Sequence, residues 1–330
     1  MLSYAVRRTL YMLPVLVIIS LFSFTLIHIM PGDYVTRMKM NPQFDARSIA
    51  ALEAYYGLNQ PFLTQYWYWV RGIILHGNFG VSFATGLPVF NTLFMGDRLM
   101  WTLIVSASTL FLTWLLAIPL GIYSATHQYK PSDHLLTFFG FSGISIPNFF
   151  FALVLLWLLV AVFHVGQYGL GVGGLFDNRF IGTPWTLAKV GNLLWHIWPA
   201  WLVIGTSGMA GLMRYMRGSL LDTLSLQYIQ TARSKGLTER VVVYKHAVRN
   251  AINPLVSMLG MSLPALVAGS LVTAIILNLP TVERTFWTAL QAQDQYVIMG
   301  GLLFFSVFLL VGNLLADFLL AWVDPRIRYD

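Results

Sequence analysis

The residues with the most chemical character form a basic segment between Arg214 and Arg249, in a chain that is otherwise mostly apolar. Two acids, Asp222 and Glu239, stand there among seven basic residues: Arg214, Arg217, Arg233, Lys235, Arg240, Lys245 and Arg249. Guanidinium and ammonium groups at this density suit acidic partner surfaces or the orientation of membrane loops, and they include no nucleophile. The pattern indicates docking or orientation rather than catalysis.

Other reactive groups are scarce. The chain has no cysteine, which excludes disulfides, thiolate metal sites and cysteine nucleophiles. It also lacks the GxxxxGK[ST] loop that cradles ATP phosphates, so it cannot be its own ATPase. His28, His164 and His196 stand at the ends of apolar runs without ligands at metal-binding spacing, and we expect them to form interfacial hydrogen bonds. The sequence therefore predicts no catalytic residue, no metal site and no cofactor bound by this chain.

Helical patterns surround the basic segment and meet at Gly236. Leucines and Tyr228 recur at helical spacing before it, and Val241, Val242, Tyr244 and Val248 follow it. Thr238 is a suitable N-cap, and Glu239 would then sit in the first turn, where the helix dipole favours a carboxylate. We predict a helix–Gly–helix hairpin with a positive φ at Gly236.

The composition is that of an integral membrane protein. Hydrophobic residues make up 57% of the 330 residues, charged residues only 10%, and the mean hydropathy is +0.68. A membrane-spanning helix needs about 20 apolar residues. Six segments qualify, so we predict an all-α membrane protein with six transmembrane helices: 10–30, 99–123, 135–163, 197–213, 254–278 and 297–323. The charge-free stretch 72–96 is rejected because its glycines and proline would leave backbone groups unsatisfied in lipid.

The fourth and fifth spans contain small residues, which let helix backbones approach closely, so we expect these two spans to face protein and not lipid. The small residues are Gly205, Ser207, Gly208, Ala210 and Gly211 in the fourth span and Gly260, Ser262, Ala265, Ala268, Gly269 and Ser270 in the fifth.

The basic residues also predict the orientation. With both termini in the cytoplasm, twelve Lys and Arg residues lie in the inner loops and eight on the outer side. Five of those eight lie in the long loop 31–98, to which the positive-inside rule gives little weight. We expect residues 1–98 to form the first transmembrane helix plus an extracytoplasmic loop, 99–323 the membrane core including a cytoplasmic loop 214–253, and 324–330 a cytoplasmic tail.

A few polar residues within the spans are candidates for lining a pathway. Ser145, Pro147 and Asn148 interrupt the third span, where local helix packing is an equal alternative. Asn313 and Asp317 lie one turn apart in the last span. An intramembrane acid is a functional candidate by default, although Asp317 stands near the cytoplasmic end, where a structural partner also fits.

The segment Thr231-Ala232-Arg233-Ser234-Lys235-Gly236, followed by Lys245-His246-Ala247-Val248-Arg249-Asn250-Ala251, resembles the EAA loop of ABC-importer permeases in its oligopeptide/dipeptide version. The similarity continues in family order along nearly the whole chain: Arg7-Arg8, Met30-Pro31-Gly32-Asp33, Tyr56-Gly57-Leu58, Gly77-Asn78-Phe79-Gly80, Asn313-Leu314-Leu315-Ala316-Asp317 and Asp324-Pro325-Arg326-Ile327-Arg328. The long first outer loop resembles the B-type subunit. Thr231 replaces the general family's Glu, as is usual in the peptide branch, and segment 279–284 lacks the family's glycine turn.

The resemblance implies a type I ABC-importer permease fold with cytoplasmic coupling helices, in the inner membrane of a prokaryote. It implies a second homologous permease, two ATPase subunits that hold ATP and Mg, an extracytoplasmic binding protein and membrane lipid as partners, with no nucleic acid. The residues carried over as the ATPase-coupling loop are Tyr228, Thr231, Ala232, Arg233, Lys235, Gly236, Glu239, His246 and Arg249. The implied cargo is di- and oligopeptides. Oligosaccharides, nickel or another small solute, or an ATP-independent secondary transporter, remain alternatives.

Overall fold

The computed structural model describes residues 2–29, 39, 45–57, 59–169, 171–256, 258, 262 and 271–323. Within these ranges the chain is helical and has no strand beyond an isolated bridge between Val81 and Pro88. This confirms the all-α prediction. The chain divides into two compact units, one formed by Met1–Thr102 with Pro280–Leu310 and the other by Leu103–Leu279 with Val311–Asp330.

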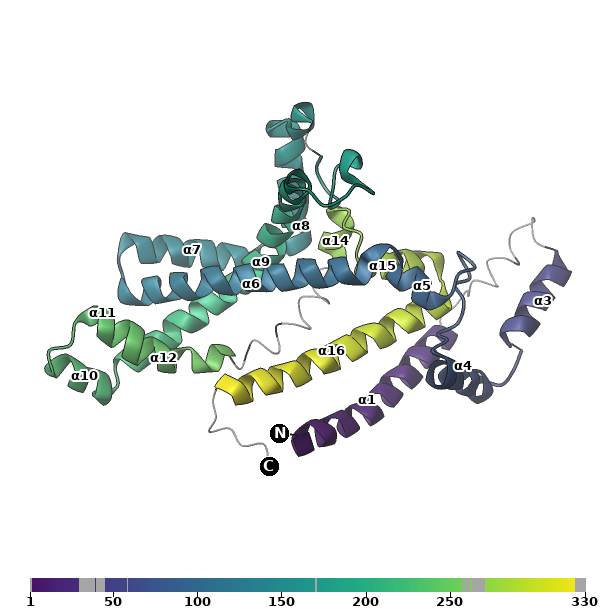
Figure 1. Cartoon of the computed structure of the whole chain (residues 1–330), viewed down its shortest axis with the longest axis horizontal. Coiled ribbons are helices and arrows are strands. Elements are labelled where there is room, and N and C mark those ends of the chain that lie inside the picture. Colours follow the sequence, from purple (N-terminus) through teal and green to yellow (C-terminus); the bar gives the residue numbers. More distant parts are fainter. Residues whose placement is uncertain are drawn as a thin grey trace. The chain divides into compact units, whose positions relative to one another are not determined.

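The first unit, called unit one below, holds the N-terminal helix and the outer-loop helices (Figure 1). Its helices are α1 (Leu2–Ile29), α3 (Ala46–Tyr56), α4 (Phe62–His76), α5 (Val89–Phe94), α15 (Val282–Ala292) and the first part of α16 (Gln295–Val323). The segment 31–98, expected as a loop, contains the short helices α3 and α4. The aromatic rings of α4 pack on α1: Phe24 lies 5.3 Å from Phe62 and 5.5 Å from Tyr66, measured between ring centroids.

The rejected stretch 72–96 contains no long helix. The helix α4 ends at Gly77, whose φ of 61° and ψ of 21° form a left-handed C-cap. Glycine adopts this conformation without the steric cost that a Cβ atom brings. A loop and the six-residue α5 follow, so the decision not to place a span here is confirmed.

The second unit, called unit two below, is centred on the 38-residue helix α9 (Leu187–Leu224). The other complete helices of this unit are α7 (Pro131–Ser145), α8 (Asn148–Trp157), α10 (Gln227–Ser234), α11 (Glu239–Val241), α12 (Val248–Ala251) and α14 (Leu271–Ile276). The unit also contains α6 (Arg98–Thr126) from Leu103 onward and α16 from Val311 onward. A π-helical stretch (Leu158–Val162) extends α8, and another (Val242–Ala247) joins α11 to α12.

Among the described residues, three helical segments are long and apolar enough to cross a membrane: Val6–Ile29, Arg98–Thr126 and Gln295–Leu315. They match the predicted first, second and sixth spans. The pair Pro131–Ser145 and Asn148–Val162 counts as a fourth if its 104° bend belongs to one span. The bend falls at Pro147, which lacks a backbone N–H and holds Ile146 in an extended conformation (φ −90°, ψ 120°). The predicted fourth span lies within α9, and about half of the fifth, twelve of its 25 residues, lies outside the described residues.

Small residues let α9 approach its neighbours closely. A Cβ atom on Gly205 would lie 3.0 Å from Thr113 Oγ1, and one on Gly143 of α7 would lie 2.8 Å from Thr206 Cγ2. The predicted contact role is confirmed for Gly205, whereas a Cβ atom on Gly211 would meet nothing within 4 Å. Of the small residues of the fifth span, Ser262 donates from Oγ to the carbonyl oxygen of Met258 at 2.9 Å, and the others lie outside the described residues: Gly260, Ala265, Ala268, Gly269 and Ser270.

Candidate functional site

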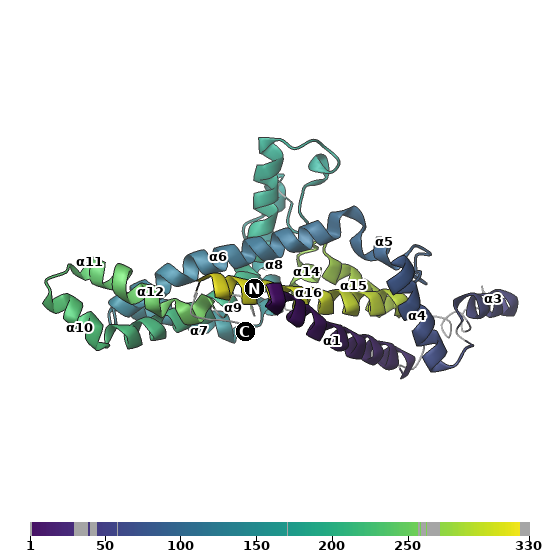
Figure 2. The same ribbon diagram turned by 60° about the horizontal axis from the view of Figure 1, so that its bottom comes forward.

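The basic segment forms a helical hairpin at the end of α9, defined here as residues 226–251. The helix α10 runs to Ser234, a turn follows, and α11 begins at Glu239 and continues through the π-helical stretch into α12. Figures 1 and 2 both place α10, α11 and α12 together in one cluster. The predicted helix–Gly–helix hairpin is therefore confirmed.

Gly236 makes the turn. Its φ is +77°, as predicted, and its N–H donates to the carbonyl oxygen of Arg233 at 2.9 Å. A Cβ atom added at Gly236 would meet no atom within 4 Å. Substitution would thus strain the backbone conformation without crowding a neighbour, at a cost of about 1–2 kcal/mol for most L-residues.

A two-bond ion pair braces the turn. Arg233 donates from Nε to Glu239 Oε2 at 3.1 Å and from Nη2 to Oε1 at 2.6 Å. The hydrogen bonds from Arg233 are the largest cause of the lowered pKa of the Glu239 carboxyl, and the positive charge of Arg233 lowers it further. The same contact raises the pKa of the Arg233 guanidinium. The sequence pattern predicts that Glu239 lies in the first turn of a helix, but it does not predict that Arg233 is its partner. Thr238 does occupy the N-cap position of α11, but its side chain makes no capping hydrogen bond there.

The underside of the hairpin is apolar and sealed. Ile229, Val242, Ala247 and Ala251 are fully buried, and they belong to one cluster with side chains of α9 and α6. The members from those two helices are Ala117, Ile122, Ala125, Leu212, Met213, Met216 and Leu220. Burying a Val- or Ile-sized side chain contributes about 1.5–3 kcal/mol. The hairpin is therefore fastened to α9 and α6 by a continuous core.

Two hydrogen bonds close the hairpin at its open end. Asn250 Nδ2 donates to the Tyr228 hydroxyl at 2.7 Å, and Ser219 of α9 donates from Oγ to the carbonyl oxygen of Ala251 at 2.8 Å. The sequence analysis placed Tyr228 in the loop but did not find its partner Asn250. The two residues are 22 positions apart, and only the antiparallel return of the hairpin brings them together.

The opposite face is polar and open to solvent. Of the residues carried over as the coupling loop, the exposed ones are Tyr228, Thr231, Arg233, Lys235, Gly236, Glu239 and Arg249. His246 is half-buried. Ala232 differs from the rest, because it is buried in the apolar cluster. Ala232 therefore packs in the core beneath the hairpin and does not belong to its exposed face.

The candidate pathway residues lie at two separate places. Ser145, Pro147 and Asn148 form the bend between α7 and α8, whereas Asn313 and Asp317 lie on α16. Ser145 and Pro147 are exposed; Asn148, Asn313 and Asp317 are half-buried. Their pathway role stays a prediction.

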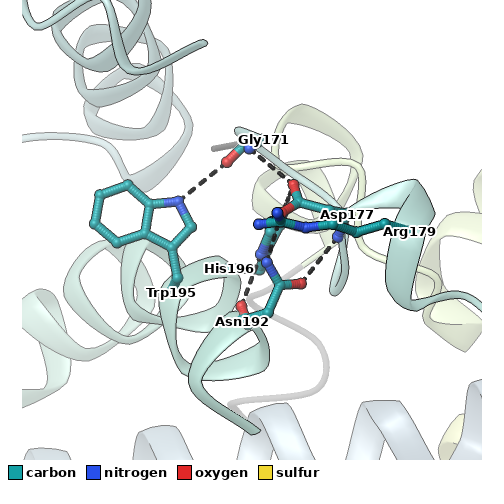
Figure 3. Close-up of polar contacts among 6 residues, drawn as sticks. All are labelled: Gly171, Asp177, Arg179, Asn192, Trp195 and His196. Carbon is teal, nitrogen blue, oxygen red and sulfur yellow. Dashed lines mark hydrogen bonds and ion pairs between the residues drawn. The ribbon is translucent and has the colours of Figure 1, made fainter. Parts of the chain in front are cut away.

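A second polar network, missed in the sequence, lies on the segment before and at the start of α9 (Figure 3). Asp177 Oδ1 accepts from the N–H of Gly171 at 2.8 Å, and Asp177 Oδ2 accepts from Asn192 Nδ2 at 2.6 Å. His196 donates from Nδ1 to the carbonyl oxygen of Asn192 at 2.8 Å, and its Nε2 lies 3.4 Å from Asp177 Oδ1. The expectation that His196 forms a hydrogen bond is confirmed. The network ties segment 171–179, which precedes α9 in the chain, to that helix.

The charge of Asp177 is compensated within this network. Burial acts most strongly and raises the pKa of Asp177, but the hydrogen bonds from Gly171 and Asn192 and the charges of His196 and Arg179 together lower it below its ordinary value. Among the described residues, no group of three or more His, Asp or Glu side chains is placed to hold a metal ion.

Comparisons with known proteins assign the family. Residues 117–329 match the model "Binding-protein-dependent transport system inner membrane component", and residues 1–115 match the N-terminal model of the same systems. The chain is 36% identical to the oligopeptide transport system permease protein AppB of Bacillus subtilis (strain 168), over the full length of both chains. It is 33% identical to the glutathione transport system permease protein GsiC of Escherichia coli (strain K12), again over the full length of both. These relatives are transport permeases rather than enzymes, and the chain belongs to the family of inner membrane components of binding-protein-dependent transport systems.

Proposed function

We propose that this chain is the permease subunit of an ATP-binding-cassette importer for peptides, and that hairpin 226–251 is the surface on which an ATPase subunit docks. The observation that carries the docking proposal is the division of the hairpin into two faces. One face is sealed onto α9 and α6, and the other presents Arg233, Lys235 and Glu239 around a braced glycine turn. Such a surface follows its helices as a rigid body, as coupling to a nucleotide-driven switch requires.

We propose the rest of the assembly from the chain's resemblance to its family. A second homologous permease completes the pathway, two ATPase subunits hold ATP and Mg, and an extracytoplasmic binding protein delivers the cargo. The chain crosses the membrane six times with both termini in the cytoplasm, which places the hairpin on the ATPase side. Residues 1–98 then form the first helix and the outer loop, and 99–323 form the permease core. The candidates for the pathway wall are Ser145, Pro147, Asn148, Asn313 and Asp317.

Peptide cargo is supported by the printed functions of the relatives, one an oligopeptide and the other a glutathione permease. Glutathione is itself a small peptide-like molecule, so both relatives fit one cargo class. Another small solute, such as an oligosaccharide or nickel, is the second candidate. The binding protein of the same system contains the deciding pocket.

The test is ATP-driven peptide uptake by the complete complex in liposomes. Gly236→Val strains the left-handed turn, and we expect at least a tenfold loss of uptake while the protein still inserts and assembles. Gly236→Asn should keep most of the activity, because asparagine tolerates positive φ. Gly191→Val is a matched control, since Gly191 is exposed, has no positive φ and would meet nothing within 4 Å of a new Cβ atom.

Each alternative gives a different result. Wild-type uptake by Gly236→Val in an assembled complex would remove the coupling role of the turn. Uptake by the isolated chain, driven by a proton or sodium gradient without ATP, would favour a secondary transporter.

A further inference from the structure

Unit one contains an apolar pocket of about 530 Å³ that the proposed docking role of the hairpin does not use. The helices α1, α4, α5 and α16 supply most of its wall, together with Phe79 and Leu99. Aliphatic and aromatic side chains make up nearly the whole lining, and none of the lining residues is charged. The pocket therefore suits a ligand that is itself apolar.

Three lining side chains carry a polar atom, and each of these atoms already has a hydrogen-bond partner. The hydroxyls of Tyr66 and Ser20 lie 2.8 Å apart, and Ser20 Oγ donates to the carbonyl oxygen of Val17 at 2.9 Å. Trp69 donates from Nε1 to the carbonyl oxygen of Phe79 at 3.1 Å. A polar ligand would lose its hydrogen bonds to water and find no unsatisfied side chain here to replace them. The bonding of the wall thus favours hydrocarbon.

The position of the pocket along the spans indicates what surrounds its mouth. Its α1 residues, 13–20, lie in the middle of the candidate span Val6–Ile29, and its α16 residues, 300–307, lie within the candidate span Gln295–Leu315. The middle of a span lies in the hydrocarbon core of a bilayer, which is about 30 Å thick. Side chains at the rim of the pocket are exposed and would meet this hydrocarbon: Leu13, Val17, Ile74, Phe90 and Val307.

The lining does not suit a neighbouring helix. Membrane helices associate through small residues that let their backbones approach closely. Only Gly300 and Ser20 are small among the lining residues, and both are buried. A Cβ atom on Gly300 would lie 2.7 Å from Val89 Cγ1, and Ser20 is bonded to Tyr66, so both already face protein of unit one. The large side chains around them leave a hollow for a flexible chain.

We propose that the apolar pocket binds an acyl chain of a membrane phospholipid. The volume falls in the range of about 300–1,000 Å³ that is usual for ligand pockets. Lipid tails are as apolar as the wall, so the stabilisation comes from packing: a chain in the hollow gives the lining atoms contacts that an empty space withholds. The inference rests on the membrane location of the family and is independent of the cargo and of the docking role of the hairpin.

The test is photolabelling of the full-length chain in phosphatidylcholine vesicles. The probe is a phosphatidylcholine with a diazirine in the middle of one acyl chain, and mass spectrometry of the peptides locates its adducts. We expect at least fivefold more label on Val17, Phe90 and Leu303 than on Ile18 and Phe22. The last two are exposed residues of α1 outside the pocket, and they report the lipid that surrounds any membrane helix.

Filling the mouth of the pocket should displace the chain. We expect Val17→Trp to lower the label on Phe90 and Leu303 at least fivefold. Val15→Trp is the matched control, since Val15 is another exposed valine of α1 and does not line the pocket, and it should leave that label unchanged. Thermal unfolding checks the fold of each variant, and Val307→Trp replaces Val17→Trp if the latter does not fold.

Three results would overturn the proposal. The first is label spread evenly over the pocket and the exposed face of α1, and the second is pocket label that neither tryptophan substitution at the mouth lowers. The third concerns the complete complex, in which the label on Phe90 and Leu303 should persist. If the label disappears there, and benzoylphenylalanine in place of Leu303 crosslinks to another subunit, the occupant is a helix of that subunit and the lipid site is wrong.

Discussion

Arg217 of α9 donates hydrogen bonds to both carboxylate oxygens of Asp133, from Nε to Oδ1 at 3.2 Å and from Nη2 to Oδ2 at 3.0 Å. Ser124 of α6 donates a further hydrogen bond to Oδ1, and the N–H of Tyr129 donates to Oδ2 at 3.0 Å. Asp133 lies in the first turn of α7 and is 2% exposed. One carboxylate therefore joins α6, α7 and α9 in unit two, and the hairpin packs on two of these helices, α6 and α9.

The substitution Asp133→Asn should destabilise the protein by about 3 kcal/mol, because it leaves the Arg217 guanidinium without its counter-charge. Thermal unfolding of the purified chain in detergent measures the change. Asp222→Asn is the control, since Asp222 is an exposed acid on the same helix α9 and should alter stability by less than about 0.5 kcal/mol. Equal small effects of both substitutions would show that the Asp133 network does not hold the three helices.

The Arg233–Glu239 pair should matter for transport far more than for stability. Both side chains are largely exposed, at 42% and 61%, and exposed pairs contribute only about 0.2–1 kcal/mol. We expect Arg233→Gln to leave the unfolding temperature almost unchanged and to lower ATP-driven uptake by the complex at least tenfold.

Arg240→Gln is the matched control for Arg233→Gln. It removes the same charge from the exposed face of the hairpin, next to Glu239 in sequence, at a position outside the predicted coupling set. Equal losses of uptake would reduce the role of Arg233 to a general contribution of positive charge.

Local pattern and long-range contact explain which features could be predicted. The hairpin, the positive φ at Gly236 and the break at Pro147 depend on neighbouring residues, and the structure has all three. The Tyr228–Asn250 bond joins residues from two arms of the hairpin, and the sequence holds no local signal for it.

Close packing between helices is also a long-range contact that the local sequence predicts only in part. Gly121 carries no motif, yet a Cβ atom there would lie 2.8 Å from the backbone oxygen of Met213, so glycine is required where α6 meets α9. Gly211 stands in a row of small residues that predicted a contact, and a Cβ atom there would meet nothing within 4 Å. Small residues indicate where a helix can approach a neighbour, but the partner must come from the fold.

The stabilisation of the folded protein by the Asp177 carboxylate should be lost in acid. Its pKa is lower in the folded protein than the ordinary value of 3.8, so its stabilisation is present above that value and is lost as the pH falls through the folded-state pKa. We expect wild type to exceed Asp177→Asn by about 1–3 kcal/mol between pH 5 and 8, with the difference narrowing below about pH 4. Unfolding temperatures of both proteins across this range provide the measurement. A difference that widens in acid would contradict the assigned network.

The proposed six-span topology would put loop 31–98 and the hairpin on opposite sides of the membrane, and single cysteines can test it because the chain has none of its own. Asn59 before α4 and Ser234 at the end of α10 are both exposed. An impermeant maleimide added to intact cells should label Asn59→Cys at once and Ser234→Cys only after the membrane is opened. Thr238→Cys, on the other arm of the hairpin, should behave like Ser234→Cys, since four residues of exposed turn cannot cross a bilayer about 30 Å thick. Labelling of Ser234→Cys from outside would put the hairpin on the wrong side for an ATPase, and the coupling proposal would fail with the topology.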